Sequence, residues 1–309
     1  MNKVVKGFLI AACVLIILGL GIFCGAATAG GISTARTMAE NGELSYRLGR
    51  IVGAELSNDG VHIELENDND ESLFNHSYKI YTSDTSIDIA PEDIEHFSFE
   101  VGAGKIEITE SDSTDFTLRT KSMKKMQTYV ENNTLYIKGK GRTSTGGEIY
   151  LEIPRGFTFD EVYFSAGASK AEIDSSLVCD KISVEIGAGE VIIDDLVCKE
   201  STFEIGAGNV EVKNAVMEDA SVDVGMGNFD MNGTVTGNFD GECGMGNITL
   251  NLTGKETDHN YEFECAAGNL TVGSMSFSGI AAEKEIDNGA TSDFSLECAM
   301  GNIEVHFNR

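Results

Sequence analysis

Acidic side chains recur at one position of a repeated pattern in this sequence, and no other residues are better placed to bind a ligand. Each stands two residues before a triplet of small residues, and the set comprises Glu100, Glu185, Glu204, Asp223, Glu242, Glu264 and Glu297. Neighbouring carboxylates can bind divalent cations, attract a cationic peptide or polymer, or serve as the acid and base of a glycosidase. The pattern therefore indicates cation binding, polymer binding or sugar chemistry.

A second acidic set follows the triplets, at Glu107, Glu172, Glu211, Asp230 and Glu304. If successive copies lie about 4.8 Å apart, as strands in a sheet do, like charges stand opposite one another and destabilise the fold. Water and salt, bound cations or a cationic partner could each offset this repulsion. The ligand set of any metal stays unknown at this stage, and the one cofactor that the carboxylates suggest is Ca2+.

Signs of other chemistry are missing from the sequence. The chain has five histidines, and none lies in a recognisable triad or in a zinc-protease pair. The small triplets lack the third glycine and the Gly-Lys-Ser/Thr sequence of nucleotide-binding loops. We therefore expect a protein that is not an enzyme and has no catalytic residues.

The triplets themselves form an internal repeat. They begin at Gly102, Gly167, Gly187, Gly206, Gly225, Gly244, Ala266 and Ala299. From Gly167 to Ala266 the step is regular, at about 20 residues, a period typical of stacked repeats. Polar and apolar residues alternate on both sides, as in Phe203-Glu204-Ile205 and Val210-Glu211-Val212, which predicts strands with one buried face. Each unit should be a strand, a tight corner, a strand and a looser turn such as Asp194-Asp195 or Asn232-Gly233.

Units of this length cannot bury an apolar face alone, whereas stacked units can. We therefore predict an all-β fold, a β-solenoid or β-helix-like stack of repeats, with a two-sheet sandwich as the alternative. The last step, from Ala266 to Ala299, is longer than the others and leaves room for an insertion around 281–291.

Stacking would align equivalent residues in columns. An asparagine directly follows five of the triplets, and we expect the amides to form a hydrogen-bonded ladder through Asn209, Asn228, Asn247, Asn269 and Asn302. Cys243, Cys265 and Cys298 each precede a triplet and should point into the core. Cys179 and Cys198 are separated by one repeat step, so a disulfide between them is left open.

The first segment suggests export. Residues 8–27 are apolar and long enough for a membrane-spanning helix, and Lys3 and Lys6 precede them, which places the N-terminus in the cytoplasm. A signal peptide cleaved near Ala29 and a lipoprotein signal ending at Cys13 are the alternatives. We expect three parts: a cytoplasmic tip and anchor at 1–35, a membrane-proximal region at 36–95 and the β-repeat domain at 96–309, outside the cell.

The amino-acid composition limits the classes of partner that the protein can bind. The 309 residues carry 50 acidic and 22 basic side chains, a formal net charge of −28, which repels nucleic acids. The expected partners are the membrane, through the N-terminal helix, and a cationic peptide or cell-envelope polymer. The oligomeric state stays open.

The order of motifs resembles a known family. Residues 97–108, with their Val-Gly-Ala-Gly corner, are followed by Leu135-Tyr136-Ile137, by the strand and turn at 149–156 and by the tandem triplets. This order, over roughly residues 80–309, is similar to that of a bacterial family of membrane-anchored β-strand-repeat proteins that are called adhesins but lack an established function. The resemblance implies no catalytic residues, and it suggests a link to envelope stress and cationic antimicrobial peptides.

Together these observations predict a non-enzymatic cell-surface protein, an adhesin or envelope-binding module that uses acidic columns. A carbohydrate-active enzyme and a structural spacer or sensor ectodomain are the alternatives. An enzyme would need a concave groove with two carboxylates at catalytic separation, and a spacer would bind none of the proposed ligands.

Overall fold

The computed structural model describes residues 79–81, 85–122, 126–139, 147–278 and 282–308. All of its regular structure is β, apart from one 3-10 turn at Glu256–Asp258, so the all-β prediction is confirmed. The predicted anchor and most of the predicted membrane-proximal region lie outside the described residues. Within the described ranges, no helix is long and apolar enough to span a membrane.

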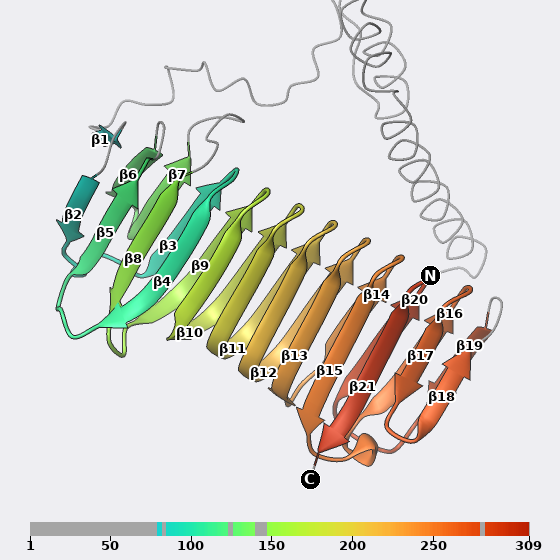
Figure 1. Ribbon diagram of the computed structural model, residues 1–309. Coiled ribbons are helices and arrows are strands. Elements are labelled where there is room, and N and C mark those ends of the chain that lie inside the picture. Colours follow the sequence, from blue (N-terminus) through green and yellow to red (C-terminus); the bar gives the residue numbers. More distant parts are fainter. Residues whose placement is uncertain (1–78, 82–84, 123–125, 140–146, 279–281, 309) are drawn as a thin grey trace, which may run out of the picture. The chain divides into compact units, whose positions relative to one another are not determined.

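The strands form two facing layers that the chain joins at its corners (Figure 1). One layer, here called the acidic layer, contains in spatial order β7 (Thr134–Gly139), β3 (His96–Val101), β9 (Thr158–Ala166), the second halves of β10 (Lys170–Ile186), β11 (Glu190–Ile205) and β12 (Asn209–Val224), then β14 (Phe239–Cys243), β20 (Asp293–Cys298) and β16 (Asn260–Cys265).

The other layer, here called the asparagine layer, is built in the same spatial order from β8 (Glu148–Pro154), β4 (Lys105–Ser111), the first halves of β10, β11 and β12, then β13 (Asn228–Val235), β15 (Asn247–Thr253), β21 (Asn302–Asn308) and β17 (Asn269–Val272). Neighbouring strands within each of these two series are parallel. Coils one repeat apart therefore stack in register, as the regular spacing of the triplets predicts.

Antiparallel strands close both ends of the stack. At one end, β6 (Met126–Glu131) pairs with β7 and β1 (Lys79–Tyr81) pairs with β6, while β5 (Phe116–Lys121) pairs with β8 and β2 (Thr85–Ile89) pairs with β5. At the other end, β19 (Ala282–Ile286) pairs with β16 and β18 (Met275–Ser278) pairs with β17.

The coils do not follow one another in sequence order at the ends. The coil of β7 and β8 lies outside that of β3 and β4, and the final coil of β20 and β21 lies between the coils of β14–β15 and β16–β17. The long step before the last triplet thus contains β18 and β19, which cap the end, and the chain then returns to fill the place inside them.

The core lies between the layers and consists of columns of apolar side chains. Alternation along β12 leaves every inward residue buried, and its phase shifts near Asn214 and Asp219, where the chain turns from one layer to the other. In the acidic layer the rings of Phe99 and Phe164 stack with centroids 4.9 Å apart.

The predicted looser turn at Asp194-Asp195 is a bend within the continuous strand β11 and does not interrupt it.

Candidate functional site

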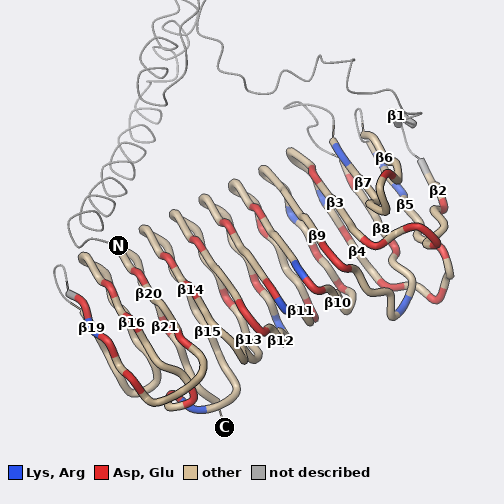
Figure 2. The backbone as a smooth tube through the Cα atoms, turned by 180° about the vertical axis from the view of Figure 1, so that it is seen from behind, with Lys and Arg blue, Asp and Glu red and all other residues tan. Residues whose placement is uncertain are grey.

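The seven predicted carboxylates lie on the outer side of one layer and in one row. Glu204 is in register with Glu185 on one side and with Asp223 on the other, and the row continues through Glu242, Glu297 and Glu264. Glu100 stands at the opposite end, separated from Glu185 by Ser165. We call this row, from Glu100 to Glu264, the acidic ladder. Figure 2 shows acidic segments recurring on successive strands.

Spatial order in the acidic ladder differs from sequence order. Glu297 lies between Glu242 and Glu264 because β20 is placed between β14 and β16. The acidic residues from Glu185 to Glu264 are therefore consecutive from coil to coil, with a strand spacing of about 4.8 Å.

At the centre of the acidic ladder, the charged form of the carboxyl groups is disfavoured. Burial raises the pKa of Asp223, and the pKa of Glu242 is raised by burial and, to a smaller extent, by the charges of Asp223 and Asp240. None of Glu204, Asp223 and Glu242 forms an ion pair with a described lysine or arginine, and like charges face one another there. The two features together make this central segment a place where added positive charge would stabilise the protein.

One end of the ladder already has partners. Lys138 Nζ lies 2.7 Å from Glu100 Oε1, and Tyr163 Oη donates a hydrogen bond of 2.8 Å to Glu185 Oε2. Burial and the bond to Glu185 raise the pKa of Tyr163 to about 12, so this hydroxyl stays protonated. Of these two contacts, only that of Lys138 supplies positive charge, since Tyr163 donates as a neutral hydroxyl.

A second row, which the sequence interpretation missed, runs beside the acidic ladder. Its residues stand two positions before those of the ladder and carry mostly hydroxyl groups; in spatial order they are Ser98, Tyr163, Ser183, Thr202, Ser221, Asp240, Ser295 and Glu262. Aligning the repeats two residues further upstream would have revealed it. The outer face therefore combines carboxylates with hydrogen-bonding hydroxyls.

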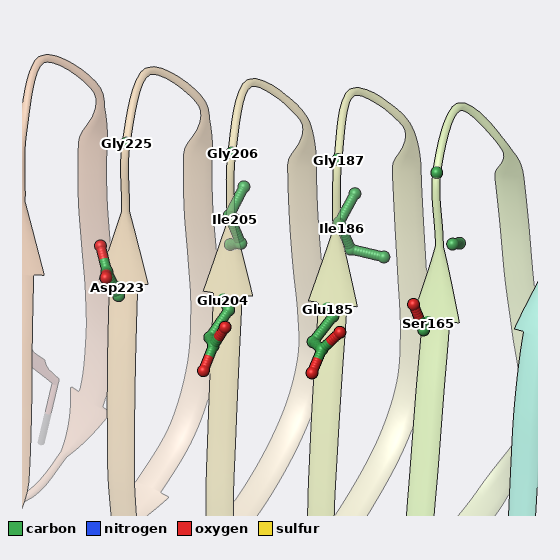
Figure 3. A pocket seen from close by; sticks show the side chains of 11 residues that line it. Ser165, Glu185, Ile186, Gly187, Glu204, Ile205, Gly206, Asp223 and Gly225 are labelled. Carbon is green, nitrogen blue, oxygen red and sulfur yellow. The ribbon is translucent and has the colours of Figure 1, made fainter. Parts of the chain in front are cut away.

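A shallow groove follows the ladder along the glycine corners (Figure 3). Ser165, Glu185, Glu204 and Asp223 border it, the glycines at the first triplet position line it, and its volume is about 520 Å³. Space is also tight at the third triplet position of the central coils, since a Cβ on Gly227 would lie 1.9 Å from the carbonyl oxygen of Gly208. Close backbone stacking thus keeps the corners small and leaves the groove open beside the carboxylates.

The asparagine ladder is present on the other layer. Each amide donates to the next through Nδ2–Oδ1 distances of 2.6 Å from Asn228 to Asn209, 2.7 Å from Asn247 to Asn228, 2.8 Å from Asn302 to Asn247 and 3.0 Å from Asn269 to Asn302. These bonds link five coils, as predicted for a structural column.

The second predicted acidic column is interrupted. Ile192 stands between Glu172 and Glu211, and Thr249 stands between Asp230 and Glu304. The first two acids of the column form ion pairs. Lys105 Nζ lies 3.1 Å from Glu107 Oε2, and Lys170 Nζ lies 3.2 Å from Glu172 Oε1. This layer therefore carries its acids in short groups, Glu107 beside Glu172 and Glu211 beside Asp230, whereas the acidic layer carries a continuous run.

The cysteines that the structure describes are buried. Cys243, Cys298 and Cys265 follow one another in register in the core, as predicted, and Cys179 is in register with Cys198, with both thiols free. Among the described residues, no three or more His, Cys, Asp or Glu side chains are arranged to hold a metal ion.

One serine and one histidine do meet. His259 Nδ1 lies 2.8 Å from Ser292 Oγ, and Ser292 donates to the carbonyl of Gly237. Both side chains are buried, and the rings of Phe294 and His259 pack with centroids 4.1 Å apart. This contact joins the inserted segment to the stack and exposes no nucleophile.

The family follows from a comparison of the whole sequence. The family model described as Toastrack DUF4097 matches residues 54–306. The chain belongs to the Toastrack DUF4097 family. The predicted resemblance to an adhesin-like family of unknown function is thereby confirmed.

Solved structures similar to this Toastrack chain include a "putative adhesin" from Bacteroides fragilis (15% identity, 73% of this chain and 98% of the other, TM-score 0.37), and a "putative adhesin" from Parabacteroides distasonis (12%, 72% and 97%, 0.38). A "putative cell adhesion protein" from Clostridium sporogenes is also similar (12%, 74% and 100%, 0.31). No curated protein sequence is similar to the chain.

Proposed function

We propose that this Toastrack chain is a non-enzymatic cell-surface protein whose acidic ladder binds an extended cationic peptide or envelope polymer. The observation that supports the proposal is the continuous run from Glu185 to Glu264, with its centre lacking described basic partners. The finer architecture that fits it is a β-solenoid held outside the cell by an N-terminal membrane helix over 8–27.

An extended ligand suits this geometry better than a single ion does. Ca2+ takes 6–8 oxygen ligands from converging groups, whereas strand neighbours present their carboxylates in a line about 4.8 Å apart. A chain with regularly spaced ammonium groups could contact several rungs at once, and its affinity would grow with the number of contacts. The neighbouring hydroxyl row would supply hydrogen bonds to its backbone.

The test is binding of poly-L-lysine to the full-length chain, measured at several salt concentrations. The variant Glu204→Gln, Asp223→Asn, Glu242→Gln should weaken binding at least ten-fold. The control variant Glu211→Gln, Asp230→Asn, Glu304→Gln removes the same three charges from the asparagine layer and should change affinity less than two-fold. Equal losses in both variants would show that net charge alone drives binding, and the ladder proposal would be withdrawn.

Two further measurements separate the alternatives. Millimolar CaCl2 should raise the melting temperature no more than NaCl of equal ionic strength does; a specific rise would replace the polymer proposal with a calcium site. Release of reducing ends from cell-wall polysaccharide, lost in the ladder variant, would replace it with the carbohydrate-active alternative.

A further inference from the structure

Three methionines form a row at the corner edge of the stack. Met226 and Met300 are each 42% exposed, and Met245 is partly buried. The other described triplets have alanine at this middle position, as in Ala188 and Ala207, so the corner itself does not require a large side chain.

The topology brings these methionines together. Met245 N donates to Gly225 O at 2.7 Å, and Met300 N donates to Gly244 O at 2.8 Å, so the three corners are direct neighbours. In the sequence the alanine triplet of Ala267 separates Met245 from Met300, but its corner lies outside that of Met300, with Ala267 N bonded to Ala299 O. The placement of the last coil inside the stack thus makes the three methionine-bearing corners contiguous.

The spacing suits a soft metal ion. Two sulfurs bound to one ion at about 2.3 Å, the length of a zinc–thiolate bond, lie within about 4.6 Å of each other. Corners about 4.8 Å apart, each with a flexible unbranched side chain, can reach this separation. Thioethers select soft monovalent cations such as Cu(I) over Ca2+ or Mg2+.

The local charge also favours a cation. Each of the three methionines follows an acidic-ladder residue by three positions, namely Asp223, Glu242 and Glu297. These carboxylates produce a negative potential at the corner edge, which raises the local concentration of cations.

We propose that Met226, Met245 and Met300 form a thioether site for Cu(I) or Ag(I). The proposal does not depend on the polymer-binding function, because its ligands lie at the corners and need no carboxylate in the coordination shell.

Ag(I), added as its nitrate salt in acetate buffer at pH 5, is the probe, and the full-length chain carries 13C-labelled methionine methyl groups. Protonation disfavours thiol ligation at this pH, while a thioether does not titrate. The ε-methyl resonances of the three residues should shift together and saturate. The affinity for Ag(I) is measured from these shifts in competition with a chelator. The variant Met226→Leu, Met245→Leu, Met300→Leu should weaken this affinity at least ten-fold.

Leucine keeps the apolar edge and removes sulfur, so it separates metal ligation from simple apolar exposure. Met275→Leu, on the cap strand β18, serves as the matched control and should bind Ag(I) as the parent does. Resonances that do not move, or unchanged Ag(I) affinity in the triple variant, would overturn the proposal. A single Met245→Leu change should cost more than either end change, because Met245 lies between the other two.

Discussion

Asn302 donates its side-chain amide to Asn247 across 2.8 Å, although 55 positions separate the two residues in the chain. The bond exists because the last coil lies next to that of β14 and β15 rather than beyond that of β16 and β17. The same placement puts Glu297 into the acidic ladder and Met300 beside Met245.

Removing a central amide should weaken the stack more than removing a terminal one. Asn247→Ala deletes two ladder bonds and Asn209→Ala deletes one, each worth about 1 kcal/mol. Urea unfolding should therefore show about twice the loss for Asn247→Ala. Equal losses for the two variants would mean that the ladder bonds contribute nothing measurable.

Neutralising one rung of the acidic ladder should stabilise the protein. Glu242 faces Asp223 and Glu297 and is only half-buried, so Glu242→Gln should raise the free energy of unfolding by about 0.5 kcal/mol at neutral pH. In 1 M NaCl, where the screening length is about 3 Å, the difference should shrink toward zero. A loss of stability at low salt would contradict this account.

Replacing a corner glycine should separate neighbouring coils. In Gly227→Ala the new methyl group would meet Gly208 O at 1.9 Å, so the backbone has to move. We expect a destabilisation of about 3 kcal/mol, in the range of strongly overpacked sites. Met226→Ala, in the same triplet, should stay within about 0.5 kcal/mol of the parent, because Met226 is exposed.

Stability should fall on mild acidification because of His259. Burial lowers the pKa of His259 below its ordinary 6.5, so the folded state holds the ring neutral while the unfolded chain takes up a proton. The stabilisation is complete above about pH 6.5 and declines as pH falls from there toward the folded pKa. His259→Gln should remove this slope between pH 7.5 and pH 5.5 in urea titrations.

Three carboxylates of the acidic layer act in the opposite direction and at lower pH. The folded-state pKa values of Asp223, Asp240 and Glu242 are raised, so protonation favours the folded state as pH falls through those values. In His259→Gln, stability should therefore rise between neutral pH and about pH 4.5. A steady fall over that range would contradict the raised pKa values.

Much of this arrangement could be predicted from the sequence, because in a stack of coils the residues at the same position of successive repeats align in one row. The position two before each triplet predicted the acidic ladder, and the position after it predicted the asparagine ladder. The order of the end coils could not be predicted, because an alternating strand pattern does not specify which strand lies next to it. In register, Cys243 fits equally well against Cys298 or Cys265. Ile192 breaks the second acidic column for a reason that the structure does not explain.

The reversed strands at the two ends also limit how the molecule can change in size. The outermost strands at both ends run antiparallel to the strands that they pair with, so a new repeat beyond β18 and β19 or beyond β1 and β2 would not continue the parallel series. Between β10 and β12, by contrast, each coil meets two near-identical neighbours. Duplication or deletion of one repeat unit there would lengthen or shorten every row by a single rung, so the reach of the acidic face could evolve independently of its ends.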